Sequence, residues 1–217
     1  MLVIVGYNLK LNINKCTEII FSSPYRSLRS NLPAPGLITG VDRVESLVML
    51  GVNVSNNLTL KCHFEDLAVK CNQSMYALRT LKRAGMRDEA VWGICRATLV
   101  AKMLYGSSAW WGFASRSNVD FLDGVLRRAT KWGLYPPNGQ TMETMVQHSD
   151  SLLFEKVLYN NKHVLHGLLP PIKTNHYNLR QRAHDRVLPV KTCSLAKNFL
   201  YRMLYSWLLQ QYNISRS

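Results

Sequence analysis

Residues 64–86 read FEDLAVKCNQSMYALRTLKRAGM, and this stretch decides most of the fold. Its apolar side chains recur every three or four residues, which is the period of an amphipathic α-helix. Lys82 and Arg83 stand in the expected last turn, where cations favour the negative end of the helix dipole, and Gly85 is a typical stop. We therefore predict a helix from Phe64 that buries one stripe, namely Leu67, Cys71, Met75, Leu78 and Leu81.

Two more helices with apolar stripes are predicted downstream, and with the first they make a small bundle. One begins at Asp88, which we take as its N-cap. The other follows Asn118 and buries Leu122, Val125, Leu126, Ala129 and Trp132. Between them lies an aromatic loop with Trp110, Trp111 and Phe113, which either complete the core or stack on bases. We expect at least one of the two loop tryptophans in the core.

The first sixty residues carry the alternating pattern of β-strands. Strands are predicted over LKLNI (9–13), TEIIF (17–21) and RVESLVMLGVNV (43–54), with a turn at Asn56-Asn57. So few strands would leave an edge and an apolar face exposed, and we expect them to belong to a larger sheet.

The C-terminal part is predicted to be helical and basic. A helix is expected from Asp150 to His166, followed by a basic linker over 172–193. A final amphipathic helix is expected to bury Phe199, Leu200, Met203, Leu204, Trp207 and Leu208. The fold class is therefore α+β, with a short β-rich segment (1–60), a mainly helical bundle (61–135) and a basic helical C-terminal extension (136–217).

The charge balance favours a polyanionic partner. Lys and Arg number 27 against 13 Asp and Glu, so the formal charge is +14 and the pI is about 9.8. Residues 156–217 alone hold ten basic side chains and one acid, which leaves +9. Nucleic acid is the expected partner, and a merely solvated basic surface is the alternative.

The cysteines, the hydropathy and the histidines bear on the cellular compartment and on metal binding. The five cysteines are scattered and include no Cys-x-x-Cys pair, which argues against a disulfide-linked partner and against a zinc site. A reducing intracellular compartment, nucleus or cytoplasm, fits this usage. No segment is long and apolar enough to cross a membrane. His163 and His166 are spaced for one helix face, yet no Cys or carboxylate nearby completes a metal site, so we expect a structural role.

Several longer strings resemble the reverse transcriptases of LINE-type (non-LTR) retrotransposons, in the order in which that family has them. LKLNINKCTEIIF (9–21) is similar to the palm segment after the active site, and VESLVMLGVNVSNNL (44–58) to the turn that begins the primer-contacting region. The predicted first helix and LYGSSAWWGFASRSNVDFLDGVLRRATKW (104–132) resemble the thumb. LLPPIKTNHYNLRQRAHDRVLPVKT (168–192) is similar to a tail found in one animal branch of these elements.

This resemblance implies a fragment of an RNA-directed DNA polymerase: the end of the palm (1–60), the thumb (61–135) and the C-terminal extension (136–217). The inherited role is binding of an RNA or DNA template-primer. The intact family uses Mg²⁺ held by an Asp pair, but no two Asp are adjacent here. We therefore expect no cofactor in this fragment and no polymerisation by it alone. The alternatives are a host-adopted nucleic-acid-binding protein and a functionless pseudogene product.

The resemblance also implies roles for single residues. Lys15 matches the palm lysine proposed to protonate pyrophosphate, an auxiliary task that needs the metals and the nucleotide. No catalytic residue and no metal ligand is otherwise expected. The predicted nucleic-acid-binding residues are basic side chains on helix faces and in the linker: Lys82, Arg83, Arg127, Arg128, Lys131, Arg180 and Arg182.

Overall fold

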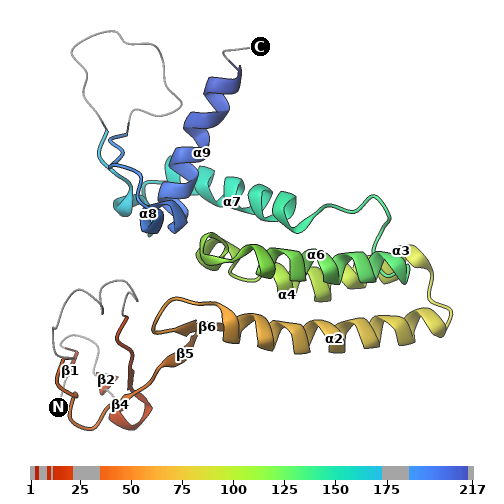
Figure 1. The fold of residues 1–217 in the computed structure, drawn as a ribbon, viewed down its shortest axis with the longest axis horizontal. Helices are drawn as coiled ribbons and strands as arrows, with labels where there is room; N and C mark the ends of the chain where they lie inside the picture. Colours follow the sequence, from red (N-terminus) through yellow and green to blue (C-terminus); the bar gives the residue numbers. More distant parts are fainter. Residues whose placement is uncertain (1–2, 5–8, 11, 22–34, 173–185, 215–217) are drawn as a thin grey trace. The chain divides into compact units, whose positions relative to one another are not determined.

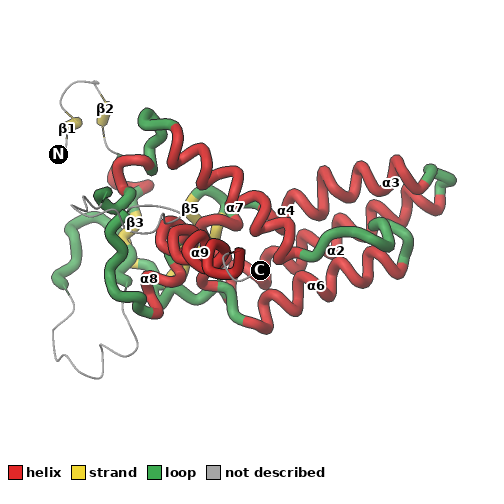
Figure 2. Tube along the Cα trace, turned by 90° about the horizontal axis from the view of Figure 1, so that it is seen from above, coloured by secondary structure: helices red, strands yellow, loops and turns green. Residues whose placement is uncertain are grey.

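The computed structural model describes residues 3–4, 9–10, 12–21, 35–172 and 186–214, of which 3–4, 9–10, 194 and 207–214 by backbone alone. The chain forms two compact units, Met1–Asp66 and Leu67–Ser217. All the named strands lie in the first unit, and helices make up nearly all regular structure of the second (Figures 1 and 2). The predicted α+β class with a mainly helical bundle is confirmed.

The first unit contains three two-stranded pairings among its described residues. β1 pairs with β2 and β5 with β6 in antiparallel register, while β3 pairs with β4 in parallel. The elements in chain order are β1 (Val3–Ile4), β2 (Leu9–Lys10), the 3₁₀ turn η1 (Ile13–Lys15), β3 (Thr17–Glu18), β4 (Asp42–Arg43), β5 (Ser46–Met49) and β6 (Val52–Ser55).

The predicted strands over 9–13 and 17–21 were too long. Within its described residues the first is strand at Leu9–Lys10, and Ile13 already belongs to η1; the second, whose residues are all described, is strand only at Thr17–Glu18. β3 and β4 pair over two residues, and an ion pair of 3.0 Å between Arg43 and Glu18 joins them. Strand propensity depends on cross-strand packing, so an alternating pattern alone overestimates strand length.

The hairpin β5–β6 turns at Leu50-Gly51, a turn that the sequence did not predict, whereas the predicted turn at Asn56-Asn57 is present directly after β6. Leu50 (φ 48°) and Gly51 (φ 81°) both adopt left-handed backbone, as a two-residue type I′ turn requires. Leucine is disfavoured there, and the turn was therefore missed. Asn57 accepts hydrogen bonds from the Ser55 hydroxyl and the Thr59 amide. These bonds form a local polar turn before the first long helix.

The helical part opens with α2, and three further long helices, α6, α7 and α9, follow among shorter elements. Three helices, α2, α3 and α6, run along roughly one direction (Figures 1 and 2). The elements are α2 (Lys61–Arg83), α3 (Asp88–Cys95), the π-helical segment η2 (Arg96–Val100), α4 (Ala101–Leu104), α5 (Ser107–Trp110), the 3₁₀ turn η3 (Trp111–Phe113), α6 (Arg116–Lys131), α7 (Met142–Tyr159), the 3₁₀ turn η4 (His166–Leu168), α8 (Cys193–Lys197) and α9 (Phe199–Ile214).

Three predicted helix starts need correction. α2 begins at Lys61, one turn before Phe64. Arg87, not Asp88, occupies the N-cap position of α3, and Asp88 lies in its first turn, where its charge favours the helix dipole. α6 begins before Asn118, because the Ser115 side chain caps it by accepting a bond from the Asn118 amide.

The prediction for α7 was wrong at both ends. The helix starts at Met142, where the Thr141 hydroxyl accepts a bond from the Thr144 amide, and it ends at Tyr159 instead of His166. A Thr-x-x-Thr start lacks the acidic partner of a capping box, so this cap was overlooked. As a result His163 lies in a turn and His166 lies in η4, and the two do not share a helix face.

The predicted apolar stripes are largely buried. In α2, Leu67, Cys71, Met75 and Leu78 are buried, and in α6 so are Leu122, Val125, Leu126 and Ala129. Leu81 and Trp132 are only half-buried. Trp110 is buried, as expected of one loop tryptophan, and its indole donates to the Tyr105 carbonyl at 2.9 Å.

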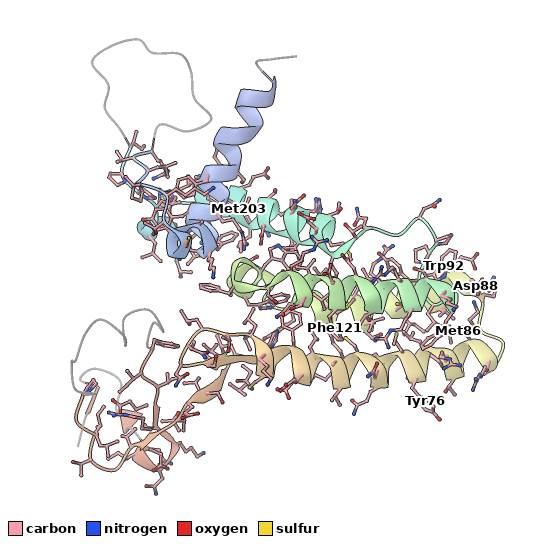
Figure 3. All side chains as sticks on the ribbon, in the orientation of Figure 1. Tyr76, Met86, Asp88, Trp92, Phe121 and Met203 are labelled. Carbon is pink, nitrogen blue, oxygen red and sulfur yellow. The ribbon has the colours of Figure 1, made fainter. Side chains whose placement is uncertain are left out.

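A second apolar cluster holds the C-terminal helices. It joins α7 to α9, and Figure 3 labels one member, Met203. Of the predicted stripe of α9, Leu200, Met203 and Leu204 are buried and Phe199 is half-buried, while the side chains of Trp207 and Leu208 lie outside the described residues. The cluster consists of Phe154, Val157, Leu169, Leu200, Met203 and Leu204.

A buried ion pair fixes α9 against α5 and α7. Asp150 of α7 is 3% exposed; it accepts a 2.6 Å bond from Arg202 of α9 and a 2.5 Å bond from the Ser108 hydroxyl of α5. Gly112 leaves room for this arrangement, because an added Cβ would lie 2.9 Å from Arg202 Nη1 and 2.0 Å from the Lys197 carbonyl oxygen. The contact therefore ties residues 52 positions apart in sequence.

Removal of Arg202 should destabilise the protein strongly. In Arg202→Ala the Asp150 carboxylate stays buried without its cation, so the free energy of unfolding is expected to fall by about 3–5 kcal/mol in urea denaturation. The matched control Arg116→Ala breaks the exposed Arg116–Asp120 pair and should cost only about 0.3–0.5 kcal/mol. Equal losses in the two variants would contradict a buried role for Arg202.

Candidate nucleic-acid interface

The C-terminal ends of α2 and α6 meet at one polar junction. Lys82 Nζ donates to the Gly133 carbonyl at 3.1 Å and pairs with Asp88 at 3.1 Å. The Trp92 indole donates to the same carbonyl at 3.2 Å, and Figure 3 shows Asp88 and Trp92 at this end of the bundle. Lys82 thus offsets the partial negative charge of the carbonyl groups at the helix ends. It has a structural role beside the predicted role in nucleic-acid binding.

Beside this junction a small basic pocket opens on an aromatic wall. Its volume is about 300 Å³, and it is lined by Arg79, Lys82, Arg83, Trp132 and Leu134. The Arg79 guanidinium lies 4.4 Å from the centroid of the Trp132 ring, a cation–π contact. Three cations therefore converge on one hollow, which favours an anion there.

Two more cations flank α2 further along. Burial raises the pKa of the Cys71 thiol to about 11, and the positive charges of Lys102 and Arg128 oppose that rise. Both side chains therefore lie close to Cys71, although they come from α4 and α6. Lys102 Nζ also donates to the Ser74 hydroxyl at 2.7 Å.

The polar face of α6 carries the predicted cations. Arg127, Arg128 and Lys131 are exposed, and as i, i+3 and i+4 neighbours they lie on one side of the helix. In the described part of the chain, neither these three nor Arg83 forms an ion pair. We define the basic face as Arg79, Lys82 and Arg83 of α2 with Arg127, Arg128 and Lys131 of α6.

The remaining predicted residues lie elsewhere. Lys15 is exposed at the end of η1 in the first unit, and it forms no ion pair with an acid among the described residues. Arg180 and Arg182 fall outside the described residues. Of the seven predicted nucleic-acid-binding residues, Lys82 and Arg83 line the pocket together with Arg79, and Arg127, Arg128 and Lys131 are exposed on α6.

The two histidines considered as metal ligands make hydrogen bonds within the chain. His163 accepts from the Leu165 amide and the His166 ring pairs with the Val157 carbonyl, as expected of structural histidines. No group of three metal-ligating side chains occurs within the described ranges. All five cysteines are free thiols, and burial raises the pKa of Cys95 to about 11, which keeps this thiol neutral. No described helix combines the length and apolar character of a membrane span.

Comparison with known proteins gives no family assignment: no family model, curated protein or solved structure matches the chain.

Two cations of this region were missed from the sequence. Arg79 and Lys102 sit inside or beside apolar stripes, where a basic residue looks like an ordinary surface position. Only the pairing of α2 with α4 and α6 places Arg79 on Trp132 and Lys102 near Cys71. The spacing of Arg79 four residues before Arg83 was the one available indication of a shared helix face.

The junction can be tested at a single glycine. Gly133 has φ +67°, and an added Cβ would lie 2.1 Å from Lys82 Nζ, so Gly133→Ala must strain the backbone and displace that ammonium. We expect about 1–2 kcal/mol of destabilisation in chemical denaturation. Gly93→Ala is the matched control, because Gly93 is helical with nothing within 4 Å, and it should stabilise by about 1 kcal/mol. Stabilisation by both substitutions would argue against the junction.

Proposed function

We propose that this protein binds nucleic acid through its phosphates, across the basic face of α2 and α6. The observation that carries the proposal is a set of exposed cations without ion-pair partners among the described residues, Arg83, Arg127, Arg128 and Lys131, next to the pocket of Arg79 and Lys82. Cations crowded in this way repel one another unless an anion lies against them. A polyphosphate chain supplies several anions at regular spacing.

The form of the surface supports backbone contact over base recognition. The cations lie on the outer sides of two helices and around a shallow hollow, and the Trp132 ring is covered by the Arg79 guanidinium on one side. Phosphate contacts hold a nucleic acid without reading its sequence. Binding is therefore expected to be weakly sequence-selective.

The resemblance to LINE-type reverse transcriptases supports the same assignment from the sequence. In that family α2 and α6 correspond to thumb segments, and the ligand would be an RNA or DNA template-primer. We propose that the chain descends from such a reverse transcriptase. The activity that we propose for it is nucleic-acid binding, without polymerisation. A host-adopted nucleic-acid-binding protein would use the same face.

Salt dependence tests the proposal. If about four to six basic side chains contact phosphates, the affinity for a duplex should fall with a log–log salt slope of about −4 to −5. The triple replacement of Arg127, Arg128 and Lys131 by Glu should flatten the slope and weaken binding to every sequence alike. Fluorescence anisotropy with labelled duplexes of differing sequence, over a series of salt concentrations, measures both effects.

A second triple variant controls for net charge. Arg116, Lys156 and Lys162 are exposed cations of the same unit outside the basic face, and their replacement by Glu changes the total charge equally. We expect it to reduce affinity much less. Replacement of Arg180 and Arg182 by Glu measures a separate contribution of the linker. An affinity indifferent to salt, or equal losses in both triple variants, would leave the positive charge as ordinary surface.

A further inference from the structure

A larger pocket lies in the helical unit between η2, α4, the turn after α6 and α7. Its volume is about 600 Å³, within the usual range of about 300–1,000 Å³ for small-molecule sites. One wall is apolar and comprises Val100, Leu104, Met145 and Leu152. None of these residues belongs to the basic face.

The described lining of the pocket holds a cation and several uncharged polar groups, among them Asn138 and Gln140, but no anion. Arg96 of η2 lines it, with His148 and Ser149 of α7, and no acidic residue is among the described lining residues. Arg96 is exposed and forms no ion pair within the described part of the chain. A lone cation over an apolar wall favours a ligand that carries a negative charge on a hydrophobic body.

The turn over residues 135–140, which lines the pocket, is held by contacts of its own. Tyr135 is 6% exposed, and its hydroxyl donates to the Gln140 carbonyl at 3.2 Å. Gly139 lies directly on the Tyr135 ring, since an added Cβ would be 1.9 Å from a ring carbon. The Gly139 amide also closes a turn onto the Pro136 carbonyl at 3.0 Å. Preformed walls lower the ordering cost of binding.

The segment that contributes Arg96 is itself unusual. η2 is five residues of π-helix between α3 and α4, and Arg96 and Val100 at its two ends both line the pocket. π-Helical turns are rare, and they recur at functional sites because the inserted residue widens the helix and redirects side chains. Here the widened turn presents its cation and one apolar group to the same cavity.

We propose that this pocket binds a small molecule that combines one flat aromatic ring with one anionic group. The ring lies against Val100, Leu104 and Leu152, and the anion pairs with Arg96. Two sources share this chemistry, a nucleoside monophosphate and an aromatic carboxylic acid. Either would bind independently of nucleic acid on the basic face, so this site stands or fails separately from the proposed function.

Methionine-methyl NMR gives a reporter inside the pocket. Met145 lines it, whereas Met203 belongs to the cluster of α7 and α9. The full chain, labelled at its eight methionine methyl groups and with Met145 assigned from Met145→Leu, is titrated with AMP and with 1-naphthoate. Adenosine and 1-naphthalenemethanol are the neutral counterparts. We expect at least one of the two anions to shift the methyl resonance of Met145 saturably, while the resonance of Met203 does not shift. The anion that does so identifies which of the two sources the pocket binds.

A matched pair of variants tests the role of the cation. Arg96→Gln should weaken the binding of the anion about tenfold or more, as loss of one charge-assisted hydrogen bond does, and should leave the neutral counterpart unaffected. Arg87→Gln removes an exposed arginine outside the pocket and should change neither. The proposal is overturned if neither anion shifts Met145, if Met203 moves with it, or if the two variants weaken binding equally.

Discussion

The apolar stripe of α6 must be removed from water, and this requirement fixes how the helix is rotated about its axis. Four buried side chains form that stripe, Leu122, Val125, Leu126 and Ala129. Each of the three larger ones is worth about 1.5–3 kcal/mol when buried, more than an exposed charge contact. The cations of the helix therefore have to lie on its outer side, and the same holds for Arg83 of α2. The position of the positive surface is a consequence of core packing.

The junction of α2 with α6 shows that not every cation there is available to a ligand. Lys82 pairs with Asp88 and donates to the Gly133 carbonyl, where the C-terminal ends of α2 and α6 meet. Arg79 covers one face of Trp132. What these two contacts do is hold the ends of α2 and α6 together, so that the uncommitted Arg83 and Lys131 are presented from a rigid base. Arg79 and Lys82, which make structural contacts here, are thus distinct from Arg83 and Lys131, which form no ion pair among the described residues.

The buried pair of Asp150 and Arg202 plays a corresponding part for the C-terminal helices. An apolar cluster can hold α9 in several similar orientations, whereas a short charge-assisted bond is satisfied in only one. Desolvation offsets most of the stabilisation that such a pair gives, and its main effect here is on orientation. Ser108 occupies the second carboxylate oxygen, which leaves Asp150 fully bonded inside the unit. The pocket lined by Arg96 also involves α7, through Met145, His148, Ser149 and Leu152.

The sequence by itself determined the α+β class, the buried stripes of α2 and α6, and the cations on the polar face of α6, because these follow from local period and from the exclusion of charge from a core. It misplaced the ends of α3 and α7 and missed the β5–β6 turn, where single caps and a left-handed Leu50 decide the backbone. Only the tertiary structure decided that Arg79 lies on Trp132, that Lys82 is held by Gly133, and that Arg96 faces a cavity. Such contacts join residues more than thirty positions apart, and no local pattern specifies which helix faces meet.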